Sequence, residues 1–199
     1  SNPFIGNVVT GILIAILVAG VIFGGIKRIG LVAGRIVPIM VLIYLLGGLG
    51  ILIKNYDKLG SIFNLIITDA FTGNAVVGGI VGEVIRQGIR RAVFSNEAGL
   101  GTEVMAHGAA KTKEPVREGL VAMLGPFIDT ILVCSITAFA ILVSGVWNDP
   151  TLNGVSMTAK AFSQELGLVG DIILFFAVFS FSITTMFGQS YYGAKCTGF

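Results

Sequence analysis

Two groups of residues in this sequence have the types and spacing to bind a small molecule and an ion. The first lies in the stretch 90–102, where Ser95, Asn96 and two glycines interrupt a very apolar chain. Gly99 and Gly101 each weaken a continuous helix by up to about 1 kcal/mol relative to alanine. A helix that breaks at membrane depth frees backbone N–H and C=O groups. Such groups are tolerated there only where they are buried in protein or line a cavity.

The same stretch has a simpler interpretation, in which Ser95 or Asn96 caps a helix in an ordinary loop. In the broken-helix interpretation both side chains instead face a pocket, and Phe94 supplies an apolar wall. Broken helices of this kind form substrate sites in secondary transporters, with half-helix N-termini facing anionic groups. The stretch alone leaves both interpretations open.

The second group lies near the end of the chain, in an apolar segment whose second half is polar. Thr184 and Thr185 follow Phe181 by three and four residues, and residues at these spacings share one helix face. Two hydroxyls and the Phe181 carbonyl form a cluster of hard oxygen atoms without net charge, which suits an alkali cation better than a transition metal. Alternatively, the threonine hydroxyls bond back to carbonyls of their own helix or hold neighbouring helices together.

Other polar residues allow different chemistry. Asp129 lies near the middle of an apolar run, where a carboxylate is costly and indicates a function by default, although pairing with a neighbouring helix explains it as well. An intramembrane enzyme could combine Asp129 with Glu103 or His107. However, Asp129 is expected at mid-membrane and His107 near the cytoplasmic end, which speaks against such a pair. Cys134 and Cys196 make no disulfide framework, and no Cys/His cluster has metal-ligand spacing.

The composition indicates an all-α, polytopic membrane protein. Of the 199 residues, 54% are hydrophobic and only 12% are charged, and the mean hydropathy is +0.91. Soluble domains carry about 25% charged residues. The net charge of +2 is too small to suggest a nucleic-acid partner, so the expected surroundings of the chain are a lipid bilayer.

Four apolar segments are long enough to cross about 30 Å of hydrocarbon. We expect these spans at about Asn7–Ile26, Leu31–Ile53, Leu120–Val143 and Leu168–Gly193. The apolar run Ile62–Phe71 is too short to cross and indicates a re-entrant or surface helix. The amphipathic segment Ala75–Ala92 leads into the broken stretch. Shorter helices are expected at Glu103–Ala110 and Met157–Leu166.

The distribution of lysine and arginine predicts the orientation of these spans. Loops 27–35 and 111–117 hold three basic residues each, and Lys195 adds one, against three on the opposite side. We therefore expect loops 27–35 and 111–117 to be cytoplasmic. Alternation then requires one crossing between Lys58 and Lys111. This makes about five spans and places the broken stretch in a discontinuous membrane-crossing helix.

Five motifs resemble the signature of the alanine or glycine:cation symporter family. They are RAVFSNEAGLG at 91–101, HGAAKT at 107–112, PVREGLVAMLG at 115–125, FIDT at 127–130 and SYYG at 190–193. The first is highly specific, and the resemblance covers essentially the whole chain. Family members are roughly twice as long and are similar to the bacterial leucine transporter, with two inverted five-helix repeats. The resemblance implies that residues 1–199 are one transmembrane domain from the middle of a longer transporter.

The resemblance also implies functional residues. The amino-acid pocket on the broken helix would be lined by Phe94, Ser95, Asn96 and Gly99. A sodium ion would be bound by the carbonyl of Phe181 and the hydroxyls of Thr184 and Thr185. The unwound first helix of the family, which supplies much of the amino-acid site and the other half of the sodium site, is absent from this chain. No binding role follows for Asp129 or Glu97, and Gln189 stands where family members often have Trp.

The expected function is sodium-coupled symport of alanine or glycine across the cytoplasmic membrane by alternating access. No bond is made or broken, so an enzyme is not expected. The expected partners are the small amino acid, the co-transported Na⁺, the lipid bilayer and the missing helices of the first repeat. One alternative is a structural portion of a transporter for a different small substrate, and a weaker one is an intramembrane enzyme.

Overall fold

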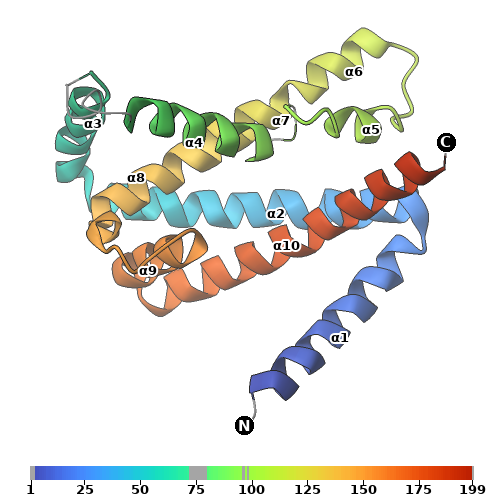
Figure 1. Cartoon of the computed structure of the whole chain (residues 1–199), viewed down its shortest axis with the longest axis horizontal. Helices are drawn as coiled ribbons and strands as arrows, with labels where there is room; N and C mark the ends of the chain where they lie inside the picture. Colours follow the sequence, from blue (N-terminus) through green and yellow to red (C-terminus); the bar gives the residue numbers. More distant parts are fainter. Residues whose placement is uncertain (1–2, 72–79, 96, 98, 199) are drawn as a thin grey trace. The chain divides into compact units, whose positions relative to one another are not determined.

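The computed structural model describes residues 3–71, 80–95, 97 and 99–198. Every described residue in regular secondary structure is helical, which confirms the all-α class (Figure 1). The elements in chain order are α1 (Pro3–Ile22), α2 (Gly25–Lys54), α3 (Tyr56–Phe71), α4 (Ile80–Ser95), α5 (Glu103–His107), α6 (Pro115–Ala122), α7 (Leu124–Pro126), η1 (Phe127–Cys134), α8 (Ser135–Ser144), η2 (Val146–Asn148), α9 (Val155–Leu166) and α10 (Leu168–Thr197). Of these, η1 is a π-helix and η2 is a 3-10 helix.

Four helical runs in the described part of the chain are long and apolar enough to cross a membrane. They are Phe4–Ile22, Gly25–Lys54, Pro115–Ser144 and Leu168–Thr197. The four uninterrupted spans predicted from the sequence are therefore confirmed as membrane-length helices. The fifth crossing, through the broken stretch, is not among them: α4 has 16 residues, and residues 72–79 lie outside the described chain. That crossing stays a prediction, as does the leucine-transporter-like arrangement.

The end of the first span differs from its prediction. α1 ends at Ile22 instead of continuing to Ile26, and α2 begins at Gly25 rather than near Leu31. Gly25 has a φ of +66°, a left-handed conformation that ends a right-handed helix and that glycine adopts at little cost. The segment 27–35, predicted to be a loop, is therefore part of a helix, while its cytoplasmic location stays a prediction.

The shorter helices follow the sequence pattern with shifted boundaries. α3 includes the predicted run Ile62–Phe71 and begins earlier, and its 16 residues agree with a helix too short to cross. α4 continues to Ser95, so the first part of the stretch predicted as broken is still helical. α5 ends at His107, before its predicted end. α9 begins at Val155 and includes the whole helix predicted at Met157–Leu166.

The third span is a run of α6, α7, the π-helix η1 and α8 rather than one uniform α-helix. Pro126 directly precedes η1 and has no N–H to donate, so one α-helical hydrogen bond is lost where the pattern widens. In a π-helix each bond reaches five residues along the chain, and π-helical turns frequently occur at functional sites. Asp129 lies in η1. A plain helix was the expectation for this span, so the π-helix is a finding of the structure.

The chain divides into two compact units, and one of them comprises residues 1–42 and 175–199. Its core consists of Ile29, Ile183 and Phe187. Partly buried apolar side chains from α1, α2 and α10 pack against this core; they are Val18, Val21, Ile22, Val32, Met186 and Tyr191. The residues predicted to bind sodium lie in this unit.

The other unit comprises residues 43–174. A glycine lets α2 approach α8 closely here: a Cβ added to Gly48 would lie 2.2 Å from the Ile136 side chain. Small residues at helix contacts are typical of membrane proteins, because they let backbones come close together. Nearby, Tyr44 of α2 stacks on Phe162 of α9 with ring centroids 5.3 Å apart. The stretch predicted to line the amino-acid pocket lies in this unit.

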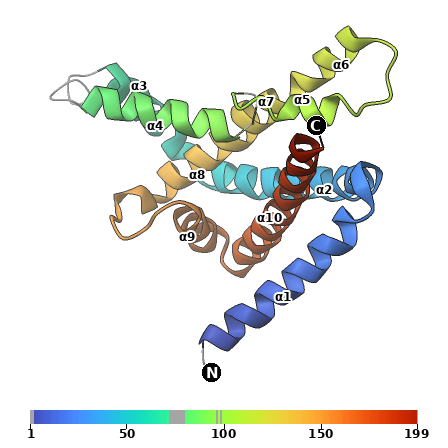
Figure 2. The same ribbon diagram turned by 45° about the vertical axis from the view of Figure 1, so that its right-hand side comes forward.

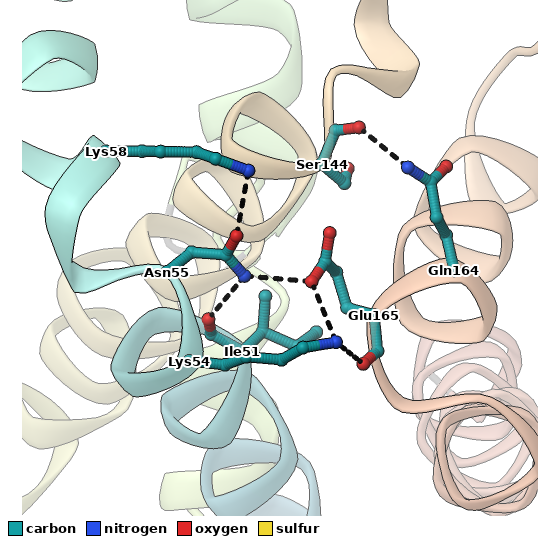
Figure 3. A network of polar contacts seen from close by, with 7 residues as sticks. All are labelled: Ile51, Lys54, Asn55, Lys58, Ser144, Gln164 and Glu165. Carbon is teal, nitrogen blue, oxygen red and sulfur yellow. Dashed lines mark hydrogen bonds and ion pairs between the residues drawn. The ribbon is translucent and has the colours of Figure 1, made fainter.

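A polar network holds one end of the second unit together (Figure 3). Asn55, between α2 and α3, is only 6% exposed, and its amide donates to Glu165 Oε2 at 2.8 Å and to the Ile51 carbonyl at 3.1 Å. Lys58 Nζ donates to Asn55 Oδ1 at 2.9 Å. Lys54 Nζ donates to the Glu165 carbonyl at 2.6 Å and lies 3.5 Å from Oε2. The network therefore joins the end of α2 to the end of α9.

Candidate functional site

The interruption between α4 and α5 is a turn built around Glu97. Glu97 has a φ of +58°, in the left-handed region that residues other than glycine rarely adopt. Its carbonyl accepts the N–H groups of Leu100 and Gly101 at 3.0 Å each, and its Oε2 accepts the Thr102 hydroxyl at 2.9 Å. A helix interruption within the stretch 90–102 is therefore present. Glu97, which has no role from the sequence alone, organises it.

The last residue of α4 contacts Asp129, the half-buried carboxyl group of the third span. The Ser95 hydroxyl donates to Asp129 Oδ2 at 2.5 Å and lies 3.8 Å from Cys134 Sγ. Asp129 and Cys134 both belong to η1, and Figures 1 and 2 both show α4 running alongside this part of the third span. The sequence left two explanations for Asp129, a functional role and pairing with a neighbouring helix, and the pairing is observed. Its partner, Ser95, is itself one of the residues predicted to contact the substrate.

The other residues predicted to line the pocket surround the same turn. Phe94 is 63% exposed. It lines a cavity of about 390 Å³ together with Gln87, Arg90 and Arg91. A Cβ added to Gly99 would lie 3.0 Å from the Val93 side chain, so the chain passes close to α4 at a position that suits glycine. Asn96 lies outside the described residues.

The residues predicted to bind sodium lie on α10. The Thr184 hydroxyl donates to the Ser180 carbonyl at 2.8 Å and to the Phe181 carbonyl at 3.2 Å. This is the back-bonding that the sequence leaves open as the alternative. It uses the hydroxyl proton and leaves lone pairs on the oxygen, so Thr184 Oγ1 and the Phe181 carbonyl form a pair of adjacent acceptors. Thr185 is exposed. Sodium binding by these residues stays a prediction.

A second cavity, of about 530 Å³, lies between α5 and α6. His107 lines it, with Nδ1 2.8 Å from Glu118 Oε1 and Nε2 3.5 Å from Glu103 Oε1. The contact between Glu103 and His107 could be predicted from the sequence, because residues four apart share one face of a helix. The link from His107 to Glu118 crosses a loop and depends on how the chain folds back. Asp129 pairs with Ser95 rather than with His107, so the catalytic pair considered above is not formed.

The chain matches the family model described as the sodium:alanine symporter family over residues 2–199. The sodium/alanine symporter AgcS of Methanococcus maripaludis is 43% identical over 199 residues, which are 98% of this chain and 44% of that protein. A protein of Haemophilus influenzae named as an uncharacterized transporter is 42% identical over 94% of this chain and 42% of its own length. The probable sodium/glutamine symporter GlnT of Bacillus subtilis is 36% identical over 100% of this chain and 42% of its own length. The chain thus spans less than half the length of these relatives.

Proposed function

Because the chain belongs to the sodium:alanine symporter family, we propose that it is part of a sodium-coupled symporter for small neutral amino acids in the cytoplasmic membrane. The observation that carries the proposal is the match of the family over residues 2–199, including the interrupted helix at Ser95 and Glu97. Relatives named as symporters and carriers support a transporter rather than an intramembrane enzyme. Four membrane-length helices support a multi-pass membrane protein.

In this proposal the amino acid binds at the interruption after α4. Its contacts in this chain are Phe94, Ser95, Asn96 and Gly99. The exposed ring of Phe94 offers an apolar surface for a small side chain, and the Ser95 hydroxyl offers a polar contact. The close approach of Gly99 to Val93 shapes the turn that ends the helix. The helices missing from this chain complete the site.

Sodium binds on α10 in this proposal, at the Phe181 carbonyl and the hydroxyls of Thr184 and Thr185. The adjacency of the first two oxygen atoms supports the assignment. Sodium in this site favours the conformation that binds the amino acid, and alternating access then carries both across the membrane. The coupling is reciprocal, so the amino acid tightens sodium binding by the same factor.

The orientation and the arrangement of the complete transporter are part of the same proposal. Segments 27–35 and 111–117 face the cytoplasm, and residues 1–199 form a transmembrane domain from the middle of a leucine-transporter-like fold. Coverage of 44% of the sodium/alanine symporter supports a portion of a longer fold. The distribution of basic residues supports the orientation.

The transported amino acid is alanine or glycine. One buried methyl group separates the two, a difference of about 0.8 kcal/mol, so both are expected to be carried. A relative named as a probable sodium/glutamine symporter supports a larger neutral amino acid as the second candidate.

Uptake of radiolabelled alanine by the complete transporter in liposomes tests the proposal. We expect uptake that requires an inward sodium gradient, is lost in Asn96→Ala, and is lost in the double variant Thr184→Ala/Thr185→Ala. Thr197→Ala is the matched control, because the Thr197 hydroxyl also bonds back to two carbonyls of α10, at 3.0 and 3.3 Å. Sodium-dependent uptake that survives the double variant overturns the sodium site. Failure to take up any neutral amino acid overturns the function.

A further inference from the structure

Asp129, the hydrogen-bond partner of Ser95, is a carboxylate within a membrane-length helical run. The 2.5 Å separation of Ser95 Oγ and Asp129 Oδ2 is at the short end of the range of about 2.5–2.7 Å for hydroxyl–carboxylate bonds. No lysine or arginine among the described residues forms an ion pair with Asp129. A carboxylate in a span faces protein or a water-filled cavity rather than lipid. The pair therefore needs a polar or cationic neighbour.

The direction of this hydrogen bond determines what the pair can bind. A serine hydroxyl has one proton, and Ser95 donates it to Asp129. The Ser95 oxygen is then left with lone pairs only, and the second carboxylate oxygen of Asp129 is also an acceptor. Both free positions accept hydrogen bonds, and together they carry one negative charge. The matching ligand group is a cation that donates several hydrogen bonds, which describes a primary ammonium group.

An alkali cation matches this place less well. Such an ion needs several hard oxygen ligands, whereas the described side-chain partners of Ser95 Oγ are one carboxylate oxygen of Asp129 and the sulfur of Cys134 at 3.8 Å. Thiols are soft ligands and suit other metals. An ammonium group requires only acceptors at hydrogen-bond distance, which Ser95 and Asp129 supply.

The local structure explains how Asp129 reaches this position. The π-helix η1 begins directly after Pro126 and places Asp129 and Cys134 beside the last residue of α4. α4 ends at Ser95 and the left-handed turn at Glu97 lies two residues further on, so the pair stands at the helix interruption. Phe94 and Gly99, which are proposed to line the amino-acid pocket, flank the same place.

We infer that the Ser95–Asp129 pair recognises the ammonium group of the transported amino acid, an inference that rests on the proposed function. Ser95 accepts a hydrogen bond from the ammonium group directly. Asp129 accepts the hydrogen bond of the serine hydroxyl, so that Ser95 can only accept from the ligand, and its second carboxylate oxygen supplies a further acceptor and the charge that favours a cation. An analogue with a hydroxyl group in place of the ammonium group, such as L-lactate in place of L-alanine, is rejected here.

The test compares alanine and lactate in the complete transporter. The two measured quantities are the KM for sodium-driven alanine uptake and the inhibition constant of L-lactate against that uptake. Loss of a charge-assisted hydrogen bond corresponds to about a tenfold to hundredfold change in affinity. We expect Asp129→Asn and Ser95→Ala each to raise the alanine KM by about tenfold to hundredfold. The inhibition constant of L-lactate should stay nearly the same, so the ratio of that constant to the alanine KM should fall by the same factor. The sodium concentration for half-maximal uptake at saturating alanine should change by less than about threefold.

Three further comparisons separate this role from a structural one. Because both side chains act on one ammonium group, the double variant Ser95→Ala/Asp129→Asn should have a KM within about threefold of the single variants. Asp129→Glu keeps the charge and should restore part of the discrimination between alanine and lactate. Asp171→Asn makes the same chemical change at an exposed carboxylate in the first turn of α10, and it should leave both constants unchanged.

Each outcome is decisive. A fall in the ratio with preserved sodium dependence supports ammonium recognition. Equal losses of alanine and lactate affinity, or a change confined to sodium dependence, overturn the inference while leaving the proposed function in place. If Asp129→Asn does not reach the membrane, the test is made with the other two variants: the ratio should fall in Ser95→Ala and should be higher in Asp129→Glu than in Ser95→Ala. A complete lack of amino-acid uptake by the unmodified transporter overturns the proposed function and the inference together.

Discussion

Replacing Glu165 by alanine should destabilise the second unit, because Glu165 links the end of α9 to the end of α2 in the network of Figure 3. The Glu165 carboxylate has only 9% exposure and accepts the amide of the buried Asn55 at 2.8 Å. In Glu165→Ala this amide proton loses its partner without gaining access to water. The main chain of residue 165 keeps its bond from Lys54 Nζ, so the effect comes from the carboxylate alone.

The magnitude follows from the two contacts of that carboxylate. Leaving a buried donor unsatisfied costs about 1–3 kcal/mol. The ion pair with Lys54 adds little, because Lys54 is 56% exposed and its nitrogen lies 3.5 Å from Oε2; pairs of this kind contribute about 0–1 kcal/mol. We therefore expect a loss of about 1–4 kcal/mol in the free energy of unfolding for Glu165→Ala. Glu165→Gln keeps an acceptor for Asn55 and should lose about 1 kcal/mol or less.

Equilibrium unfolding in mixed detergent micelles measures these differences. The exposed side chain of Glu114 provides the control, since Glu114→Ala should change the free energy of unfolding by less than about 0.5 kcal/mol. The double variant Asn55→Ala/Glu165→Ala should be less destabilised than the sum of the single changes, because it removes donor and acceptor together. The reasoning is refuted if Glu165→Ala and Glu165→Gln have equal effects, or if the double variant is additive.

Three further changes test other parts of the structure. Gly48→Ala should cost about 1–3 kcal/mol in the free energy of unfolding, because the added Cβ would lie 2.2 Å from the Ile136 side chain of α8. Gly50 has open space around it, so Gly50→Ala is the control and should be neutral or stabilising. Equal costs for the two variants would contradict this packing. Glu118→Ala removes the contact to His107 of α5, so tryptic cleavage between α5 and α6 should become faster. An unchanged rate would contradict a role of the His107–Glu118 contact in holding α5 and α6 together. Two hydrogen bonds from Thr151, first from its hydroxyl and second from its backbone N–H, hold the pKa of Asp149 below its usual value. The stabilisation from these bonds is therefore complete above the usual aspartate pKa, and it is lost as the pH falls through the lowered pKa of Asp149. Thr151→Ala should raise that pKa in a carboxyl ¹³C titration, and an unchanged pKa would contradict the contact.

The membrane-length helices could be predicted from composition alone, because a run of apolar residues that long has one main solution in a bilayer. Helix boundaries that depend on the backbone conformation of a single residue could not be predicted in this way. The left-handed φ of Gly25 ends the first span early, yet glycines elsewhere in the same helices lie in ordinary helical conformations. Similarly, the left-handed φ of Glu97 is not foreseeable from its residue type, because residues other than glycine rarely adopt that conformation.

The site shows the same division between local and tertiary information. The interruption after Ser95 is a local feature, which the glycines at 99 and 101 predict. Its contact with Asp129 joins residues far apart in the sequence through a π-helix, and apolar periodicity does not distinguish a π-helix from an α-helix. The spacing of Phe181 and Thr184 correctly predicts that their oxygen atoms are neighbours. What such a pair binds is a question of chemistry that spacing does not answer.

Accumulation of alanine against its own gradient is the measurement that tests the central claim most directly. Liposomes containing the complete transporter are loaded with alanine at the external concentration, and an inward sodium gradient is applied at constant membrane potential, with a potassium gradient as the comparison. Coupling predicts that internal alanine rises above the external concentration with sodium and stays equal with potassium, and that collapsing the sodium gradient releases the excess. Equilibration without accumulation under the sodium gradient would contradict sodium-coupled symport.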